Sequence, residues 1–527
     1  MSTLILHPML QLCWTAAAAH ALGVVCNSSL VPFMDTVGTA IPGSSPVTLT
    51  GADATPEHCR SLCCADAACG VFTFVTGQAA AGAANCWLKA EGGQLGPSAP
   101  CARGGPYGCT SSVVRPDAPP SPGCISELDC QLSGLCVNGT CDCDPGWKGA
   151  HCGQLDLLPN NSSGHFAYRP PAPAGAAAPY WNSWGASQPL RDAAGTYHLF
   201  ATSILNGCGL NVYTFNEQLV HATSTSLLGP YSFRNVALNT TIINPHVLRV
   251  PQQLVADAGA GAGAGAGGDA KFVLFYSGEP LPSHFHKNCT TGDRNSDTGS
   301  GSSGSNSSGT PAGVAEPPGP PGKYLNIGCV LSIATASALD APFQVQAANF
   351  TPAGAEGLFC RTNPTAYIFP NGTTLLFFRS AGSRGESEQI WLARAPHYLG
   401  PYALVTPGAP VFPNHNEDPF VFRNERGRFL LMLHQSNWGP GQNGAKAYSH
   451  DGLDWHFSAE SMSDVWSSEV ALADGSSVAF ARREEPKIYV DEKGHMRAMF
   501  NAVADSRGGG YATYVMSQAI AGPKGSD

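Results

Sequence analysis

The sequence predicts a mainly β protein, a five-bladed β-propeller preceded by two small disulfide-rich modules. Three observations lead to this prediction. A polar residue followed by proline recurs five times, and a strand-like apolar stretch follows each of these steps. The regular units recur at roughly 55–70 residues, which is typical of repeat architectures whose single units cannot bury their own faces. Most of the 19 cysteines precede the repeats.

The repeats share a register. In four units a glycine lies seven residues before the polar residue that ends the apolar stretch, and Ala270 replaces this glycine in the second unit. Strands joined by turn residues in this way predict β-blades, here over residues 165–520. The polar-proline steps are Gln188-Pro189, Asn244-Pro245, Asn363-Pro364, Asp418-Pro419 and Glu485-Pro486, and the polar residues that end the stretches are Thr202, Ser277, Arg379, His434 and Asn501.

The second unit is longer than the others because it contains two low-complexity tracts. Residues 257–269 are rich in alanine and glycine, and residues 290–322 are rich in glycine, serine and proline. Such tracts bury too little apolar surface to become ordered. The strand-like stretch FVLFYS lies between them, so we expect disordered insertions between the strands of the second blade rather than domain linkers.

The composition argues for an extracellular protein. The net charge is -10 and there is no basic run, which excludes nucleic acid as a partner. The N-terminal apolar run ends in Ala19-His20-Ala21, so residues 1–21 are predicted to be a signal peptide rather than a membrane anchor, for which the run is short. No other segment has the length and hydropathy to span a bilayer.

The cysteines and the glycosylation sequons also predict secretion. Eighteen cysteines remain after the predicted signal, an even number that fits disulfides formed in an oxidising compartment. Together with them, the N-x-S/T sequons fit a glycoprotein. The sequons begin at Asn27, Asn138, Asn160, Asn161, Asn239, Asn288, Asn306, Asn349 and Asn371.

Residues 124–152 contain six cysteines and end in the pattern C-x-C-x-x-G-W-x-G-x-x-C, which resembles an EGF-like domain. The resemblance implies the pairs Cys124–Cys136, Cys130–Cys141 and Cys143–Cys152. Bridges replace a core that so few residues cannot form. The acidic calcium-binding pattern is absent before the first cysteine, so no calcium is expected. The module is interpreted as a spacer, with a protein-contact module as the alternative.

Residues 22–112 contain the segment CRSLCCADAACGVFTF and later NCWLKA, and they resemble a PAN/apple-type domain. The resemblance implies the pairs Cys63–Cys69 and Cys59–Cys86, and a domain that binds protein or carbohydrate. A proline-rich linker over 113–123 leads to the EGF-like domain. Tight Cys/His spacing is absent, so no metal and no cofactor are expected. The pairing stays open for Cys26, Cys64, Cys101, Cys109, Cys208, Cys289, Cys329 and Cys360.

In a propeller the first strand of each blade lines the central channel, so the polar-proline steps are expected to bring their side chains together at one mouth. The asparagines could satisfy one another and the turn backbone. Four ionisable groups in one pocket are costly unless they bind something. The predicted binding residues are Gln188, Asn244, Asn363, Arg379, His434 and Asn501, and the predicted catalytic pair is Asp418 and Glu485.

The stretch GTYHLF and the motifs NEDPFVF and RREEPKIY resemble the five-bladed propellers of glycoside hydrolase family 43. The resemblance implies three inner-strand carboxylates, including a general acid and a general base. This chain has Gln188 at the expected position of the base, and its carboxylates remain only in the fourth and fifth units. It is therefore predicted either to hydrolyse polysaccharide with Asp418 and Glu485 or to bind glycans as a pseudoenzyme. The alternative is a non-catalytic extracellular matrix or adhesion protein with an extracellular protein partner.

Overall fold

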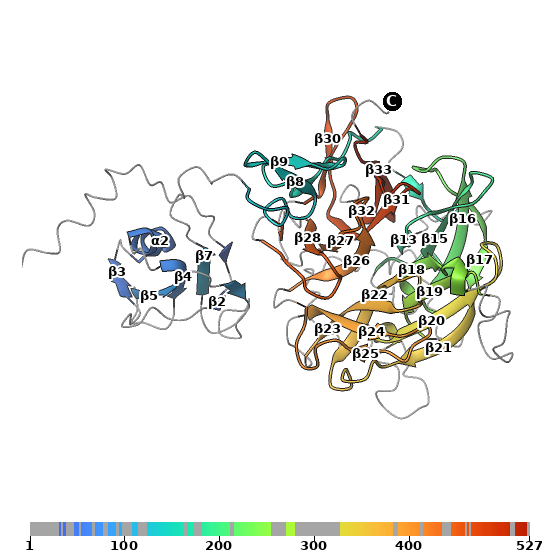
Figure 1. Cartoon of the computed structure of the whole chain (residues 1–527), viewed down its shortest axis with the longest axis horizontal. Helices are drawn as coiled ribbons and strands as arrows, with labels where there is room; N and C mark the ends of the chain where they lie inside the picture. The colour runs from blue at the N-terminus through green and yellow to red at the C-terminus, as the bar shows by residue number, and fades with distance from the viewer. Residues whose placement is uncertain are drawn as a thin grey trace, which may run out of the picture. The chain divides into compact units, whose positions relative to one another are not determined.

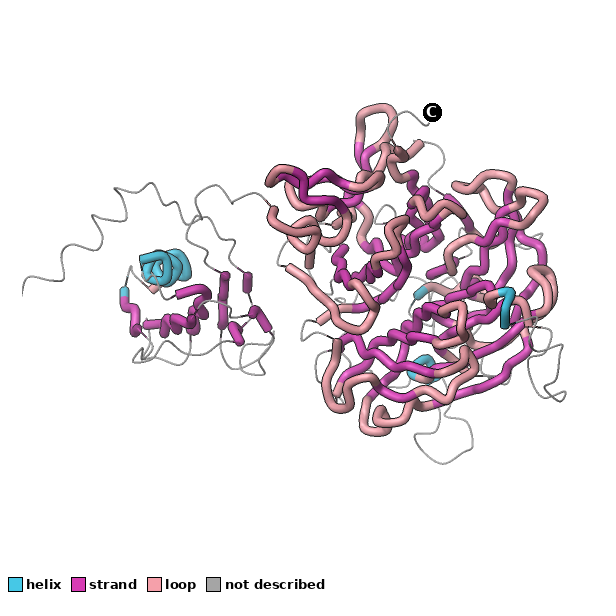
Figure 2. Tube along the Cα trace, in the orientation of Figure 1, coloured by secondary structure: helices cyan, strands magenta, loops and turns pink. Residues whose placement is uncertain are grey.

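The computed structural model describes residues 31–32, 35–37, 47–51, 54–65, 69–76, 83–90, 94–96, 108–113, 124–161, 166–171, 182–210, 216–254, 270–279, 327–382, 388–411, 415–434, 444–458, 461–462, 465–505 and 512–523. It forms two compact units, residues 1–123 and residues 124–527 (Figures 1 and 2). The predicted signal peptide, the linker after Val113 and the two predicted insertions lie outside the described residues. No helix of the described residues is long and apolar enough to cross a membrane.

The first unit is a small sheet with one helix. The helix α2 (Pro56–Ala65) begins after Thr55, whose hydroxyl accepts a hydrogen bond from the His58 amide at 3.1 Å, as an N-cap does. The disulfide Cys59–Cys86 joins α2 to β5, which is the pair that the PAN/apple resemblance implies. Cys63 is also disulfide-bonded, and its pairing with Cys69 stays a prediction. The sheet has the order β1 (Val31–Pro32), β7 (Gly108–Val113), β4 (Cys69–Thr76), β5 (Ala83–Ala90), β3 (Val47–Thr50), and β2 (Asp35–Val37) pairs with β6 (Gln94–Gly96).

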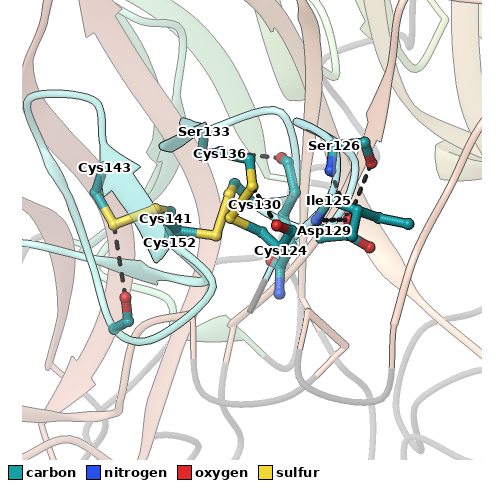
Figure 3. The surroundings of a disulfide bond; sticks show 12 residues. Cys124, Ile125, Ser126, Asp129, Cys130, Ser133, Cys136, Cys141, Cys143 and Cys152 are labelled. Carbon is teal, nitrogen blue, oxygen red and sulfur yellow. Dashed lines mark hydrogen bonds between the residues drawn. A yellow bond between two sulfur atoms is a disulfide. The ribbon is translucent and has the colours of Figure 1, made fainter. Parts of the chain in front are cut away.

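The second unit begins with two short hairpins held by disulfides. One hairpin joins β8 (Gly134–Val137) to β9 (Thr140–Cys143), and the other joins β10 (Trp147–Lys148) to β11 (Gln154–Leu155). Asp129 closes the first turn, because its Oδ2 accepts hydrogen bonds from the amides of Ile125 at 2.9 Å and Ser126 at 2.8 Å (Figure 3). The disulfides are Cys124–Cys136, Cys130–Cys141 and Cys143–Cys152, the three pairs that the EGF-like resemblance implies.

Five antiparallel sheets follow, and the first four are each made of strands that are consecutive in the chain (Figure 1). Sheet one contains β13 (Asn182–Ala186), β15 (Tyr197–Ile204), β16 (Glu217–Ser224) and β17 (Ser232–Leu238), with β14 (Leu190–Arg191) beside β15. Sheet two contains β18 (Ile243–Arg249), β19 (Phe272–Ser277), β20 (Leu331–Ala336) and β21 (Gln344–Phe350), and the 3-10 helix η4 (Ile327–Cys329) precedes β20. Sheet three contains β22 (Phe359–Ile368), β23 (Thr374–Ala381), β24 (Glu388–Ala395) and β25 (Ala403–Leu404).

Sheet four contains β26 (Glu417–Arg423), β27 (Phe429–His434) and β28 (Gly444–Ser449). Sheet five contains β31 (Arg482–Val490), β32 (Met496–Asp505), β33 (Ala512–Ala519) and β12 (Phe166–Tyr168), so both ends of the repeat region meet in it. A hairpin of β29 (Glu469–Ala471) and β30 (Ser477–Ala479) lies between the last two sheets in the sequence.

The first strands of the sheets contact one another in chain order, and the series closes on itself. β13 contacts β18, β18 contacts β22, β22 contacts β26, β26 contacts β31, and β31 contacts β13. Apolar clusters fill the space between neighbouring sheets. In β23, for example, Leu376 and Phe378 pack toward sheet two, whereas Leu375 and Phe377 pack toward sheet four. The unbroken apolar run LLFF therefore follows from burial on both faces of the strand.

The EGF-like domain shares a core with the sheets. Its Leu132 and Trp147 pack in one cluster with residues of sheets four and five, among them Phe422 and Met499. The ammonium group of Lys446 on β28 is buried and donates hydrogen bonds to Ser133 Oγ and to the Cys152 carbonyl, both at 2.8 Å. The interpretation of this module as a spacer therefore does not fit, since a spacer would not bury its residues in the core of its neighbour.

Candidate functional site

Four inner strands carry a β-bulge at the polar-proline step. The first residue of each bulge has a positive φ: Asn244 53°, Asn363 50°, Asp418 52° and Glu485 53°. The strand register shifts at each of these positions. Asparagine and aspartate tolerate this conformation, whereas glutamate rarely adopts it. Bulges re-aim side chains, and here the backbone turns four polar side chains toward one another.

The structure brings these four side chains into one buried group, which we call the central cluster (Asn244, Asn363, Asp418 and Glu485). Asn244 Nδ2 donates to Glu485 Oε1, which links sheets two and five. Asn363 Nδ2 donates to Asp418 Oδ1 and also to Glu485 Oε1, the latter at 3.3 Å. The Glu485 amide donates to Asp418 Oδ2 at 3.0 Å. The asparagines thus satisfy the carboxylates, as sequence reasoning allowed.

Gln188 does not belong to the central cluster, and this corrects its assignment to the first blade's polar position. Its Nε2 donates to the Val247 carbonyl at 3.0 Å. The bulge of sheet one lies instead between Ser183 and Ala186, and Gly185 there has a φ of 77°. A Cβ on Gly185 would lie 3.5 Å from the Glu485 carboxyl carbon, which is an ordinary contact distance, so the positive φ and not a lack of space favours glycine here.

The spacing of the sequence contains the signal that separates Gln188 from the others. The turn glycine follows Asn363, Asp418 and Glu485 by nine residues, and it follows Gln188 by only seven. The matching position in sheet one is therefore two residues earlier, at Ala186 beside the bulge.

The polar residues that end the second strands have different roles. Ser277 Oγ accepts hydrogen bonds from the Asn363 amide and from Thr362 Oγ1, both at 3.0 Å, so it supports the neighbouring bulge. Asn501 is buried, where it donates to the Glu484 carbonyl at 3.1 Å and accepts from Arg483 Nε at 3.0 Å. The Asn501 side chain therefore bonds to groups inside sheet five, and it does not face a ligand site as predicted.

His434 and Arg379 lie next to the central cluster on its sheet-three and sheet-four side. His434 is 2% exposed, and its Nδ1 lies 3.8 Å from Asp418 Oδ2. Arg379 Nη1 contacts Glu417 Oε2 and lies 3.1 Å from Glu388 Oε2. With His415, these residues form what we call the outer cluster (Arg379, Glu388, His415 and Glu417).

The outer cluster differs from the central cluster in its access to solvent. The side chains of Arg379, Glu388 and Glu417 are 15%, 25% and 12% exposed. Burial raises the pKa of Glu388, and burial lowers the pKa of His415. Sequence reasoning missed Glu388 and His415, because it considered only the residue before each proline and the polar residue that ends each apolar stretch, and neither side chain stands at one of these positions.

Both carboxyls of the central cluster hold protons more tightly than usual. Burial, and next the Asp418 carboxylate, raise the pKa of Glu485 to about 8, and the ammonium group of Lys487, 3.4 Å from Glu485 Oε2, opposes this shift. Burial and the neighbouring Glu417 raise the pKa of Asp418. Two carboxylates this close cannot both ionise freely, so the pair retains a proton near neutral pH.

Two groups of side chains outside the disulfides have the ligand types of a metal site. In each group, a guanidinium group already pairs with at least one of the carboxylates. The potential ligand atoms of Asp418, His434 and Glu484 lie within 4.8 Å of one another, and so do those of Glu388, His415 and Glu417. Arg482 binds Glu484 with two hydrogen bonds, of 2.6 and 2.7 Å. Arg379 occupies the place of a cation between Glu388 and Glu417.

Comparisons with known proteins identify the N-terminal modules. A PAN domain matches residues 43–89, and an EGF-like domain matches residues 124–152. The comparison with curated protein sequences found no match.

Among solved structures, a family 117 glycoside hydrolase of the marine bacterium Zobellia galactanivorans is 12% identical, with a TM-score of 0.42, over 70% of this chain and 90% of that one. The α-L-arabinofuranosidase PaAbf62A of Podospora anserina is 13% identical, with a TM-score of 0.40, over 67% and 95%. The catalytic domain of the GH62 α-L-arabinofuranosidase of Coprinopsis cinerea is 12% identical, with a TM-score of 0.42, over 69% and 98%. Similarity at this level does not transfer an activity, so function must be inferred from the residues of the site.

Proposed function

We propose that the five sheets are the blades of a five-bladed β-propeller and that the chain is a secreted glycan-directed protein. The closed series of contacts between first strands supports the propeller. The three motifs that resemble glycoside hydrolase family 43 support a glycan as the ligand. Disulfides in both the PAN and the EGF-like domain support an extracellular location.

The geometry of the central cluster favours binding over hydrolysis by Asp418 and Glu485. In glycosidases the two carboxyls flank the scissile bond at roughly 5–10 Å. Here the Asn363 amide nitrogen bridges the two carboxylates, where the glycosidic oxygen would have to enter. Asp418 and Glu485 are each 3% exposed. In addition, the bulge of sheet one has Gly185 and no carboxylate to act as a base.

The observation that carries the proposal is the outer cluster, where a partly exposed guanidinium group is held between two carboxylates. Carboxylate and guanidinium groups with fixed positions suit the adjacent hydroxyls of a sugar, because each offers paired hydrogen-bonding atoms. Arg379 is held by Glu388 and Glu417, so little conformational entropy is lost when a ligand binds. We place the glycan site at this cluster, at the edge of the buried central cluster.

A panel of polysaccharides, tested with the secreted chain for binding and for release of reducing sugar, checks this proposal. We expect binding without release. Arg379→Lys keeps the charge but loses the planar fork and should weaken binding by about tenfold. The exposed Arg394 on β24 of the same sheet provides the control, and Arg394→Lys should bind as the parent does. Sugar release that Asp418→Asn abolishes would instead establish the catalytic alternative.

A further inference from the structure

Among the residues that the structure describes, one edge of the outer strand β21 pairs with no other strand. It is the end strand of sheet two and pairs with β20 on one side. Val345 on this strand is 38% exposed. No charged residue occurs between Asp340 and Glu356, whereas the corresponding strand β17 of sheet one carries Arg234. An exposed strand edge without charges is a template for pairing with a second chain.

Asn349 lies near the end of this strand and is exposed. It sits in a β-bulge with a φ of 51°, and its backbone amide donates to Ser332 Oγ at 3.1 Å. Its side-chain amide makes no hydrogen bond within the described part of the chain. Asn349-Phe350-Thr351 is an N-x-T sequon, so the residue at the bulge of this edge strand is also an acceptor for a glycan.

The sequon at Asn160 shows the opposite environment. Asn160 is 8% exposed, and its Nδ2 donates to the Ser517 carbonyl at 2.8 Å. A glycan on that nitrogen would break this bond and would have to enter the core beside β33. The exposure of Asn349 is therefore not a general property of the sequons in this chain.

We propose that Asn349 carries an N-linked glycan that covers the free edge of β21. This rests on the proposed secretion, because the transfer occurs on the secretory route. Asn349 Nδ2 attacks C1 of an oligosaccharide carried on a lipid diphosphate. The N–C1 bond forms, the bond from C1 to the diphosphate oxygen breaks, the lipid diphosphate leaves, and the amide nitrogen loses a proton. The bulky hydrophilic glycan then supplies the protection that charged residues give to other edge strands.

The test uses the full chain secreted from a eukaryotic host. Mass spectrometry of peptides should find a glycan at Asn349 and none at Asn160. The control is Asn371, an exposed sequon in the turn between β22 and β23, where Oδ1 accepts from the Thr373 amide at 3.1 Å. Thr351→Ala removes this sequon and leaves the positive-φ residue Asn349 in place. It should aggregate several times faster than Thr373→Ala, which removes the sequon of Asn371, in light scattering below the unfolding temperature. Adding Val345→Lys to Thr351→Ala should restore solubility, because a charge on the edge replaces the glycan.

Two results would overturn the proposal: Asn349 unmodified while Asn371 is glycosylated, or equal aggregation of the two threonine-to-alanine variants. A chain without any glycan would overturn secretion as well, whereas loss at Asn349 alone leaves secretion and the glycan-binding site unaffected.

Discussion

At the scale of single residues, the central cluster is a buried pair of acids that accept hydrogen bonds from amides, retain a proton and lie beside the Lys487 ammonium group. The polar-proline steps in the sequence predicted that Asn244, Asn363, Asp418 and Glu485 would meet. The pattern could not predict the hydrogen bonds between them, because these depend on the bulge geometry and on which side chains lie opposite across the axis. The pattern also placed Gln188 in the cluster, because the units were aligned on the residue before proline. Alignment on the nine-residue spacing to the turn glycine would have excluded Gln188.

The raised pKa of Glu485 predicts how the stability of the fold depends on pH. The folded state binds this proton more tightly than the unfolded state, so its contribution to stability is complete at low pH. It should decline as the pH rises from about 4.5 to about 8. Glu485→Gln resembles the protonated form and should flatten this decline, whose slope can reach about 1.4 kcal/mol per pH unit.

Urea unfolding of the parent and of Glu485→Gln at pH 5, 6, 7 and 8 measures the effect. Glu492 is exposed and serves as the control, so Glu492→Gln should keep the slope of the parent. An unchanged slope in Glu485→Gln would show that this carboxyl is already ionised across the range.

Asn363 is expected to tolerate loss of its side chain better than conversion to aspartate. Asn363→Ala removes the donor to two carboxylates, whereas Asn363→Asp also adds a third acid to a site that is 6% exposed. An uncompensated buried charge costs about 3–5 kcal/mol. Thermal unfolding at pH 7.5 should therefore rank parent, alanine and aspartate in falling order. Aspartate as stable as the parent would contradict this account of the cluster.

At the scale of elements, the apolar stretches predicted the second strand of each sheet because both faces of these strands are buried. FVLFYS and LLFFRS correspond to β19 and β23. The outer strands were harder to predict, since most side chains of β17 and β21 are exposed or half-buried and do not alternate regularly. Disulfides beyond the N-terminal modules were also left open, and the structure joins Cys329, just before β20, to Cys360 in β22.

The disulfide and the long insertion before it should contribute very differently to stability. Deleting residues 290–322 should shift the melting temperature little, because the closure entropy of a long loop changes by only about 0.6 kcal/mol per doubling of length. Replacing Cys329 and Cys360 with serine opens a loop with a sequence separation of 31 and should cost about 3–4 kcal/mol. Calorimetry of both variants checks the contrast. A large loss on deletion would mean that the insertion is part of the fold.

At the scale of the whole molecule, the EGF-like domain packs against the sheets and stabilises them, which a spacer would not do. Sheet four has three strands where the other sheets have four or five, and the module packs against its strands and those of sheet five. Polar contacts fix the orientation: Arg428 binds Glu127 at 2.6 Å, and Arg426 binds Asp144 at 2.8 Å. Stability of the second unit should therefore depend on the module.

Trp147 is the residue that tests this dependence. It is 5% exposed in the shared core, and the ammonium group of Lys446 lies 3.7 Å from the centre of its ring. Trp147→Ala should cost about 3–5 kcal/mol through the lost packing. It should also speed hydrogen exchange in β28, because Lys446 belongs to that strand. Ile125→Ala changes a side chain of the same module that is 87% exposed and should leave exchange unaffected. If Trp147→Ala loosened only residues 124–152 while β28 stayed protected, the module would fold as an independent spacer.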